Sequence, residues 1–407
     1  MNSGRIAVSI LGMAAIAALI YAETQSVKPR HVATAKDSSR TPGRAASDEA
    51  VGKSLKWLVS VQGHDGGWGQ DGGETSYVRK GEHLESSGND VANTAVALTA
   101  LLRDGHGPTA GAYRTPFQRG LGFILTQVEQ SPTDGLAITK VTGTQIQRKL
   151  GPYIDTFLTS KLLGELDGHM GDAQANARVR KALEKCIAKI EKNQLQDGSW
   201  NVSGGWAPIL GTSLASQSLR IAKDKGVAVQ QTAMARVDDY TKRTASGRGG
   251  GVRSGSGGVV GGVPGGMPSA GLASEAVTVS AGVPLYKSAQ ELEQLSRTPE
   301  DRARNAKQIS AITSNLADSK FVSGFGSIGG EEFFSYLNIS DSLRRTGGRD
   351  WEKWNSEMTA KLLTLQNEDG TWAGHHCITG RVAVTSAAIL LLRADRDPSI
   401  LTSSIKK

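Results

Sequence analysis

The chain has 407 residues, of which 38% are hydrophobic and 5% aromatic, with 50 glycines and a formal net charge of +8. The basic residues concentrate in three segments that lack hydrophobic periodicity, residues 23–47, residues 241–253 and the lysine pair 406–407, and these carry more than the whole excess. A nucleic-acid groove needs basic residues gathered on the folded body. We therefore exclude nucleic-acid binding.

The N-terminus predicts export. Residues 1–22 have one early basic residue, Arg5, followed by an uncharged and mostly apolar run, which is the pattern of a signal peptide. The run is close to the shortest length that spans a membrane, so cleavage and retention as an N-terminal anchor are both open. Either way we expect a periplasmic, extracellular or membrane-anchored protein. Residues 23–47 are polar and without periodicity, and predict a disordered linker.

A short motif, Q-x-x-D-G-x-W, occurs three times, at residues 62–68, 194–200 and 366–372. Each copy follows an amphipathic segment. Its glycine suits the left-handed conformation that ends a helix, and its Asp suits a turn in which the side chain accepts from nearby amides. The Trp offers a broad apolar surface, and the Gln amide can bond free carbonyls or amides at helix ends. The motif therefore predicts a helix stop that fastens neighbouring helices together.

The motifs divide the chain into repeated helical hairpins. Amphipathic, half-exposed outer helices are expected at 48–62, 115–130, 175–194, 227–243, 298–316 and 350–366. Inner helices that are apolar nearly all round are expected at 88–102, 151–166, 210–222, around 271–283, 329–345 and 379–393, and such helices must be buried. We predict an all-α domain over residues 48–395, in which two concentric rings of six helices close on themselves.

Two further segments flank or interrupt this domain. Residues 247–271 are rich in glycine and predict an insertion without regular structure. It forms either a plain flexible loop or a lid over the cavity. Residues 396–407 form a C-terminal tail.

The motif and the paired helices resemble the repeats of squalene–hopene and oxidosqualene cyclases and of protein prenyltransferase β subunits, over residues 48–395. The resemblance implies an (α/α)6 toroid with a central cavity, ligand-binding groups at the ends of inner helices, and activity on an isoprenoid-like lipid. The D-x-D-D acid motif of the cyclases is absent, since "RVDD" has Arg236 in the first acidic position. No D-x-C zinc pair of the prenyltransferases occurs, and aromatic residues that would stabilise carbocations are few.

Polar residues gather at the expected starts of the inner helices. We expect a cavity site formed by Glu331, Glu332, His376 and Cys377, with Asp90 or Asp155 nearby. Cys377 would act as nucleophile or ligand, His376 as base or ligand, and a Glu as the orienting carboxylate. An alternative is a zinc site whose candidate ligands are His375, His376, Cys377 and Asp155. A further alternative is structural: the acids cap helices and the histidines bond loop carbonyls.

Three functions are compatible with these residues. The first is an enzyme acting on an isoprenoid-like or other ligand in the cavity. The second is a non-catalytic toroid that binds a hydrophobic ligand of the cell envelope or serves as a scaffold. The third and weakest is a polysaccharide-degrading toroid, which is indicated only by the paired acids Glu331 and Glu332 near Tyr336. Cys186 lies beside the apolar stripe of its helix, and we expect a buried, inert thiol; a disulfide with Cys377 is the alternative.

Overall fold

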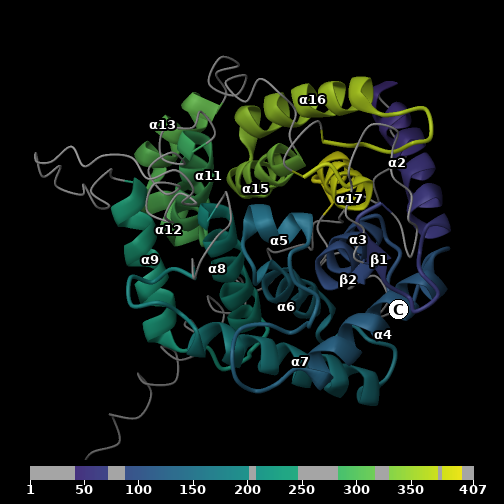
Figure 1. Cartoon of the computed structure of the whole chain (residues 1–407). Coiled ribbons are helices and arrows are strands. Elements are labelled where there is room, and N and C mark those ends of the chain that lie inside the picture. Colours follow the sequence, from purple (N-terminus) through teal and green to yellow (C-terminus); the bar gives the residue numbers. More distant parts are fainter. Residues whose placement is uncertain are drawn as a thin grey trace, which may run out of the picture. The chain divides into compact units, whose positions relative to one another are not determined.

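Helices make up nearly all of the regular secondary structure among the described residues (Figure 1). The computed structural model describes residues 42–71, 88–200, 208–245, 283–316, 330–374 and 378–396. Ala45–Lys407 forms one compact unit, and of the unit Met1–Arg44 only residues 42–44 are described. The expected signal sequence 1–22, the insertion 247–271 and the tail beyond Arg396 lie outside the described residues. None of the described helices has both the length and the apolar character needed to cross a membrane.

Five of the six predicted hairpins have counterparts among the described helices, and the fourth has its outer helix there together with an inner helix that was not predicted. The outer helices are α2 (Pro42–Ser60), α4 (Arg114–Gln130), α7 (Ala173–Lys192), α9 (Gln231–Ala245), α12 (Pro299–Arg304) with α13 (Ala306–Leu316), and α16 (Gly348–Leu365). The inner helices are α3 (Val91–Arg103), α6 (Ile154–Leu166), α8 (Pro208–Asp224), α11 (Val283–Leu295), α15 (Gly330–Thr346) and α17 (Arg381–Leu392). A short helix, α5 (Gln145–Leu150), precedes α6, and the strands β1 (Trp68–Gly69) and β2 (Asn89–Asp90) pair antiparallel.

Four boundaries differ from the sequence prediction. Helix α2 begins at Pro42, so residues 42–47 of the expected linker are helical, with proline in the first turn, where its missing N–H is not needed. The expected outer helix 298–316 is broken at Asn305, which ends α12. The described inner helix of the fourth hairpin, α11, starts at Val283, where the expected helix was to end; residues 271–282 lie outside the description. Helix α5 was not predicted, although Thr144 and Gln147 form a capping box at its start.

The inner helices contact one another in succession. Helix α3 packs on α6, α6 on α8, α8 on α11, α11 on α15, α15 on α17, and α17 again on α3. In α3 every residue except Thr99 is buried, and in α17 every residue except Arg381. Alanine recurs in both helices, with threonine in each and a serine in α17, and such small residues let the backbones approach closely. The prediction that these helices are buried on all sides is confirmed for α3 and α17.

The motif tryptophans lie at the ends of outer helices. All three side chains are buried, at 0–4% exposure. Each indole Nε1 donates to a backbone carbonyl ten residues earlier, in the last turn of the outer helix, at 2.7–2.8 Å: Trp68 to Leu58, Trp200 to Ile190 and Trp372 to Leu362. Each Trp thus satisfies a carbonyl that the helix itself leaves free. The predicted position of the tryptophans is confirmed.

The motif glutamine joins one outer helix to another. Its Nε2 donates to the carbonyl of the motif glycine and also, at 2.9–3.0 Å, to a carbonyl of a neighbouring outer helix: Gln62 to Pro116 of α4, Gln194 to Ala233 of α9, and Gln366 to Ala50 of α2. The expected fastening of outer helices is therefore confirmed. The third of these links joins the last hairpin to the first.

The aspartate and glycine of the motif shape the turn. In each copy the Asp Oδ1 accepts from the amide two residues later at 2.8–3.0 Å, and the glycine has φ between 86° and 93°, as predicted. These glycines also lie against the next outer helix. A side chain at Gly198 would collide with the carbonyl of Arg236 in α9.

The second hairpin lacks the motif tryptophan, and a lysine takes over part of its task. Lys189 of α7 is 2% exposed, and its Nζ donates to the carbonyls of Gly135 and Ala137 at 2.9 and 3.1 Å. Burial lowers the pKa of this amine. A buried ammonium group needs such partners, and here they are carbonyls of the degenerate turn. The second hairpin is thus held to α7 by different chemistry.

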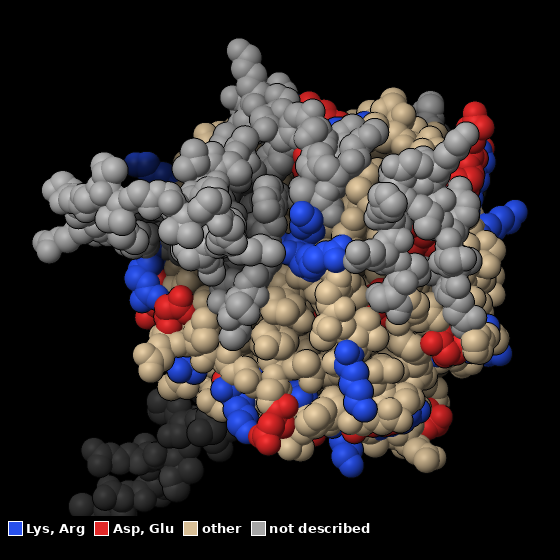
Figure 2. All heavy atoms as spheres, in the orientation of Figure 1, with Lys and Arg blue, Asp and Glu red and all other residues tan. Residues whose placement is uncertain are grey.

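The surface carries both signs of charge. On the face shown in Figure 2, Lys and Arg side chains are interspersed with Asp and Glu, without a large field of one sign in the described part of that face. Several charged side chains of the described residues form exposed pairs, such as Arg178 with Glu129 at 2.7 Å, and such pairs contribute little to stability.

Candidate functional site

Asp90 and Asp155, two of the predicted site residues, meet in the core at the starts of α3 and α6. Both residues are buried, each with 2% of its surface exposed. Asp90 is the N-cap of α3, where its two oxygens accept from the backbone and side chain of Asn93 at 2.8 and 2.7 Å. Asp155 accepts from the amide of Ala92 at 3.1 Å and from Gln147 Nε2 at 2.7 Å. All four carboxyl oxygens are therefore engaged in holding helix starts in place.

Proximity and burial change the acidity of both groups. Burial, followed by the charge of Asp155, raises the pKa of Asp90 to about 7, and burial raises the pKa of Asp155 to about 6. Two carboxylates in one buried site disfavour double ionisation. The pair therefore binds a proton near neutral pH. Its hydrogen bonds nevertheless match the structural alternative, in which these acids cap helices.

Glu332 is buried, but it faces an aromatic cluster. Its Oε2 accepts from the hydroxyl of Tyr336 at 3.2 Å, and Lys361 Nζ donates to the same hydroxyl at 3.1 Å. The ring of Tyr336 meets Trp354 edge to face, with the centroids 6.1 Å apart. The structure thus gives Glu332 a place between helices α15 and α16. The side chain of Glu331 lies outside the described residues.

The remaining predicted site residues, His375, His376 and Cys377, also lie outside the described residues. The residues on either side are described: a side chain at Gly374 would collide with the backbone of Gly330, and one at Gly330 would collide with the carbonyl of Ile378. Both ends of the segment therefore lie at the start of α15. Within the described ranges, no group of three His, Cys, Asp or Glu side chains could hold a metal ion. The roles expected of Glu331, His376 and Cys377, and the zinc site, stay predictions.

Cys186 is a free, fully buried thiol. Burial raises its pKa to about 12. A thiol reacts through its thiolate, so Cys186 is inert at neutral pH. This confirms the interpretation of Cys186 as a core residue and disfavours the disulfide alternative.

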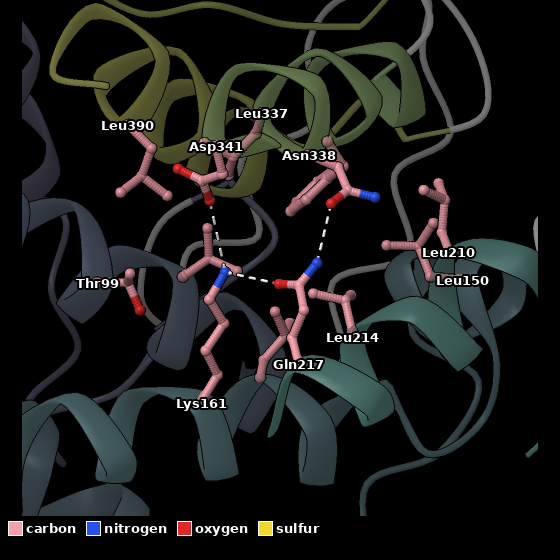
Figure 3. A pocket seen from close by; sticks show the side chains of 13 residues that line it. Thr99, Leu150, Lys161, Leu210, Leu214, Gln217, Leu337, Asn338, Asp341 and Leu390 are labelled. Carbon is pink, nitrogen blue, oxygen red and sulfur yellow. Dashed lines mark hydrogen bonds and ion pairs between the residues drawn. The ribbon is translucent and has the colours of Figure 1, made fainter. Parts of the chain in front are cut away.

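A cavity lies among the inner helices (Figure 3), and the sequence did not predict the residues that line it. We call it the apolar chamber; it contains about 600 Å³ of atom-free space, part of it open to solvent. Its wall comes from α3, α5, α6, α8, α15 and α17, and consists of Val96, Thr99, Leu150, Leu158, Lys161, Leu210, Leu214, Gln217, Phe334, Leu337, Asn338, Asp341 and Leu390. Neither Asp90, Asp155 nor Glu332 belongs to this wall.

Four polar side chains form a chain across the wall of the apolar chamber. Asn338 Oδ1 accepts from Gln217 Nε2 at 2.9 Å, and Gln217 Oε1 accepts from Lys161 Nζ at 3.2 Å. Lys161 Nζ in turn lies 3.8 Å from Asp341 Oδ2. Figure 3 shows these contacts linking α15, α8 and α6. Two hydrogen bonds and one longer ion pair thus link these polar groups, and apart from Thr99 the rest of the wall is hydrocarbon.

A second cavity adjoins the first and shares Lys161, Gln217 and Asp341 with it. We call it the charged chamber; it contains about 970 Å³ of atom-free space, part of it open to solvent. It is lined by side chains near the C-terminal ends of inner helices: Arg103, Lys161, Glu165, Gln217, Arg220, Ile221, Asp224, Lys225, Asp341, Arg344 and Arg345. The two chambers together place hydrocarbon at one end and charge at the other.

The charged side chains of the charged chamber shift one another's pKa values. Burial would raise the pKa of Asp341, but the positive charges of Arg103 and Lys161 outweigh burial and lower it. Asp341 is therefore ionised at neutral pH. Sequence signals for this region existed, because Lys161, Gln217 and Asp341 are long or charged polar residues inside predicted inner helices. They lie far apart in the sequence, and only the packing of three hairpins brings them together.

The chain matches no known protein family, and no curated protein is recognisably similar to it. Function must therefore be inferred from the site itself.

Proposed function

We propose that the six hairpins form a closed (α/α)6 toroid of the cell envelope and that its cavity binds an apolar ligand without transforming it. Closure is supported by two independent sets of contacts. The inner helices contact each other in a succession that returns from α17 to α3, and Gln366 links the last hairpin to Ala50 in the first. A closed ring leaves no end hairpin with an exposed apolar face.

The apolar chamber is the observation that carries the binding function. Ligand pockets are concave, mostly apolar and furnished with a few polar groups that orient the ligand. The chamber has this composition, with leucines from α5, α6, α8, α15 and α17 and a polar chain on one side. It contains a single aromatic side chain, that of Phe334. We expect it to accept a flexible hydrocarbon chain, of isoprenoid or acyl type.

Of the carboxyl groups predicted for the site, the three that the structure describes favour binding over catalysis. Asp90 and Asp155 have every oxygen engaged at helix starts, and Glu332 bonds Tyr336 away from the chamber wall. A general acid must reach the substrate atom that it protonates. These groups are held elsewhere by their hydrogen bonds, whereas the chamber wall offers hydrocarbon contacts.

Displacement of a fluorescent apolar probe tests the proposal. N-phenyl-1-naphthylamine should brighten when it enters the chamber of the full chain, and 1-dodecanol should displace it. Leu214→Trp fills the chamber and should reduce probe binding about tenfold or more, while Lys223→Trp, exposed on the same helix α8, should bind as wild type. A circular dichroism melt checks that both variants fold. Equal binding by wild type and a folded Leu214→Trp variant would show that the chamber is not the site.

A further inference from the structure

The charged chamber contains more positive charge than its own acids neutralise. Six basic side chains and three acidic ones line it, a net charge of +3. Two of the acids are already shared, since Asp224 pairs with Arg220 at 3.7 Å and Asp341 lies between Arg103 and Lys161. Behind the lining, the buried Glu293 also pairs with Arg220 at 3.3 Å, so the lining together with Glu293 carries a net charge of +2. A cavity with such an excess attracts anions, and its low-dielectric walls strengthen the attraction.

Arg103 is the clearest sign that a partner is missing. The residue is 3% exposed, yet its Nε and Nη1 have no hydrogen-bond partner among the described residues. The nearest carboxylate oxygen, Asp341 Oδ1, is 3.7 Å from Nη1, too far for a hydrogen bond. Leaving buried guanidinium donors unpaired is unfavourable. Arg103 lines the charged chamber, so an acceptor bound there lies beside a buried arginine that has two unpaired donors.

A second arginine shows what a purely structural role looks like in this fold. Arg393 ends the neighbouring inner helix α17 and is 5% exposed. Its Nε donates to Asp104 at 2.6 Å, and its Nη1 pairs with Asp48 at 2.8 Å. Both arginines could offset the partial negative charge of a helix C-terminus. Of these two arginines, only Arg103 lines a cavity and has donors, Nε and Nη1, without a hydrogen-bond partner among the described residues, so offsetting the helix charge does not account for it.

We propose that the charged chamber binds the phosphate group of an amphiphile whose hydrocarbon chain occupies the apolar chamber. This inference rests on the proposed binding function and specifies its ligand as a phosphate monoester of a single apolar chain. The chambers adjoin at Lys161, Gln217 and Asp341, so one molecule reaches both. A phosphate monoester carries a charge of about −1.5 to −2 at neutral pH. This charge balances the excess positive charge of the lining better than the single negative charge of a carboxylate does. Guanidinium groups also match phosphate oxygens in geometry.

Isothermal titration with three probes tests the inference on the full chain. Dodecyl phosphate, below its micelle concentration, should bind at least about tenfold more tightly than 1-dodecanol, because charge-assisted hydrogen bonds add to the same hydrocarbon contacts. Inorganic phosphate distinguishes a site for the free anion from a site for a lipid headgroup. If it binds as tightly as dodecyl phosphate, the site serves free phosphate and the amphiphile assignment is wrong.

Variants of Arg103 complete the test. Arg103→Met should weaken dodecyl phosphate binding about tenfold and leave 1-dodecanol binding unchanged, and Arg103→Lys should retain most of the affinity because it retains the charge. Arg304→Met, at an exposed position of α12, is the control and should bind as wild type. Equal affinities of the wild type for the phosphate and the alcohol would overturn the inference while the proposed function stands. Absence of binding by either amphiphile would overturn both.

Discussion

Removing the glutamine that joins the last hairpin to the first tests whether the fold closes. Gln366 Nε2 donates to Ala50 O at 2.9 Å and contacts Ser54 Oγ at 3.1 Å, both in α2, besides the carbonyl of Gly370 at 3.0 Å. A net contribution of about 0.5–1.5 kcal/mol per hydrogen bond gives a loss of roughly 1–3 kcal/mol for Gln366→Ala in the free energy of unfolding. Urea denaturation followed by circular dichroism measures this quantity.

Gln194→Ala is the matched control for this experiment. Gln194 makes the equivalent bonds, to Gly198 O at 3.1 Å and to Ala233 O at 3.0 Å, but it joins two outer helices in the middle of the chain. In a closed fold the two substitutions destabilise to a similar extent. In an open array the contacts of Gln366 with α2 would be absent. A loss below about 0.5 kcal/mol for Gln366→Ala, with a normal loss for Gln194→Ala, would therefore refute closure.

Three further predictions concern the motif and the acid pair. Trp372→Phe should destabilise by about 1–3 kcal/mol, because the Leu362 carbonyl loses its donor, and Trp372→Ala by about 3–5 kcal/mol because a cavity is added. Gly198→Ala should destabilise by about 3 kcal/mol or more, against about 1–2 kcal/mol for Gly226→Ala, because both glycines have positive φ but only Gly198 lies against another helix. Asp90 has a pKa of about 7 in the folded protein against an ordinary value of 3.8. Its contribution to stability is therefore present below pH 3.8 and is lost as the pH rises to 7. Over this range the free energy of unfolding of the wild type should fall by on the order of 2–4 kcal/mol relative to that of Asp90→Asn.

Denaturation midpoints check these three predictions. For the tryptophan, equal losses for the Phe and Ala variants would mean that the indole hydrogen bond is not formed. For the glycines, equal losses would place the turn away from α9. For the acid pair, the difference between wild type and Asp90→Asn should depend on pH below neutrality and level off above it; Asn keeps the capping oxygen. A difference that is constant from pH 4 to 8 would show that Asp90 titrates normally.

The repeat motif made most of the helix arrangement predictable. Its four residues have local tasks, such as the turn at Gly198 or the indole bond of Trp200, and local tasks leave a pattern in the sequence. The predicted helix boundaries were wrong where a second feature of the sequence obscured the hydrophobic periodicity. Asn305 ends a helix in the middle of an amphipathic segment, and α11 follows a glycine-rich stretch that hides its start.

The candidate site was predictable only in part. Polar residues at inner-helix starts were recognised, and Asp90 and Asp155 do meet, but the free amides of those helix ends occupy their oxygens. The chambers depend instead on residues such as Lys161 and Asp341, which become neighbours only when separate hairpins pack together. Periodicity identifies which face of a helix is buried, and it does not reveal where the packing leaves space.

A crystal structure of the full chain with dodecyl phosphate tests the central claim most directly. The account predicts a closed circuit of six hairpins, with the dodecyl chain between Leu214 and Phe334 and a phosphate oxygen within hydrogen-bonding distance of Arg103 Nε or Nη1. A structure with the hairpins in an open array, or with the ligand bound elsewhere while both chambers hold only water, would contradict it.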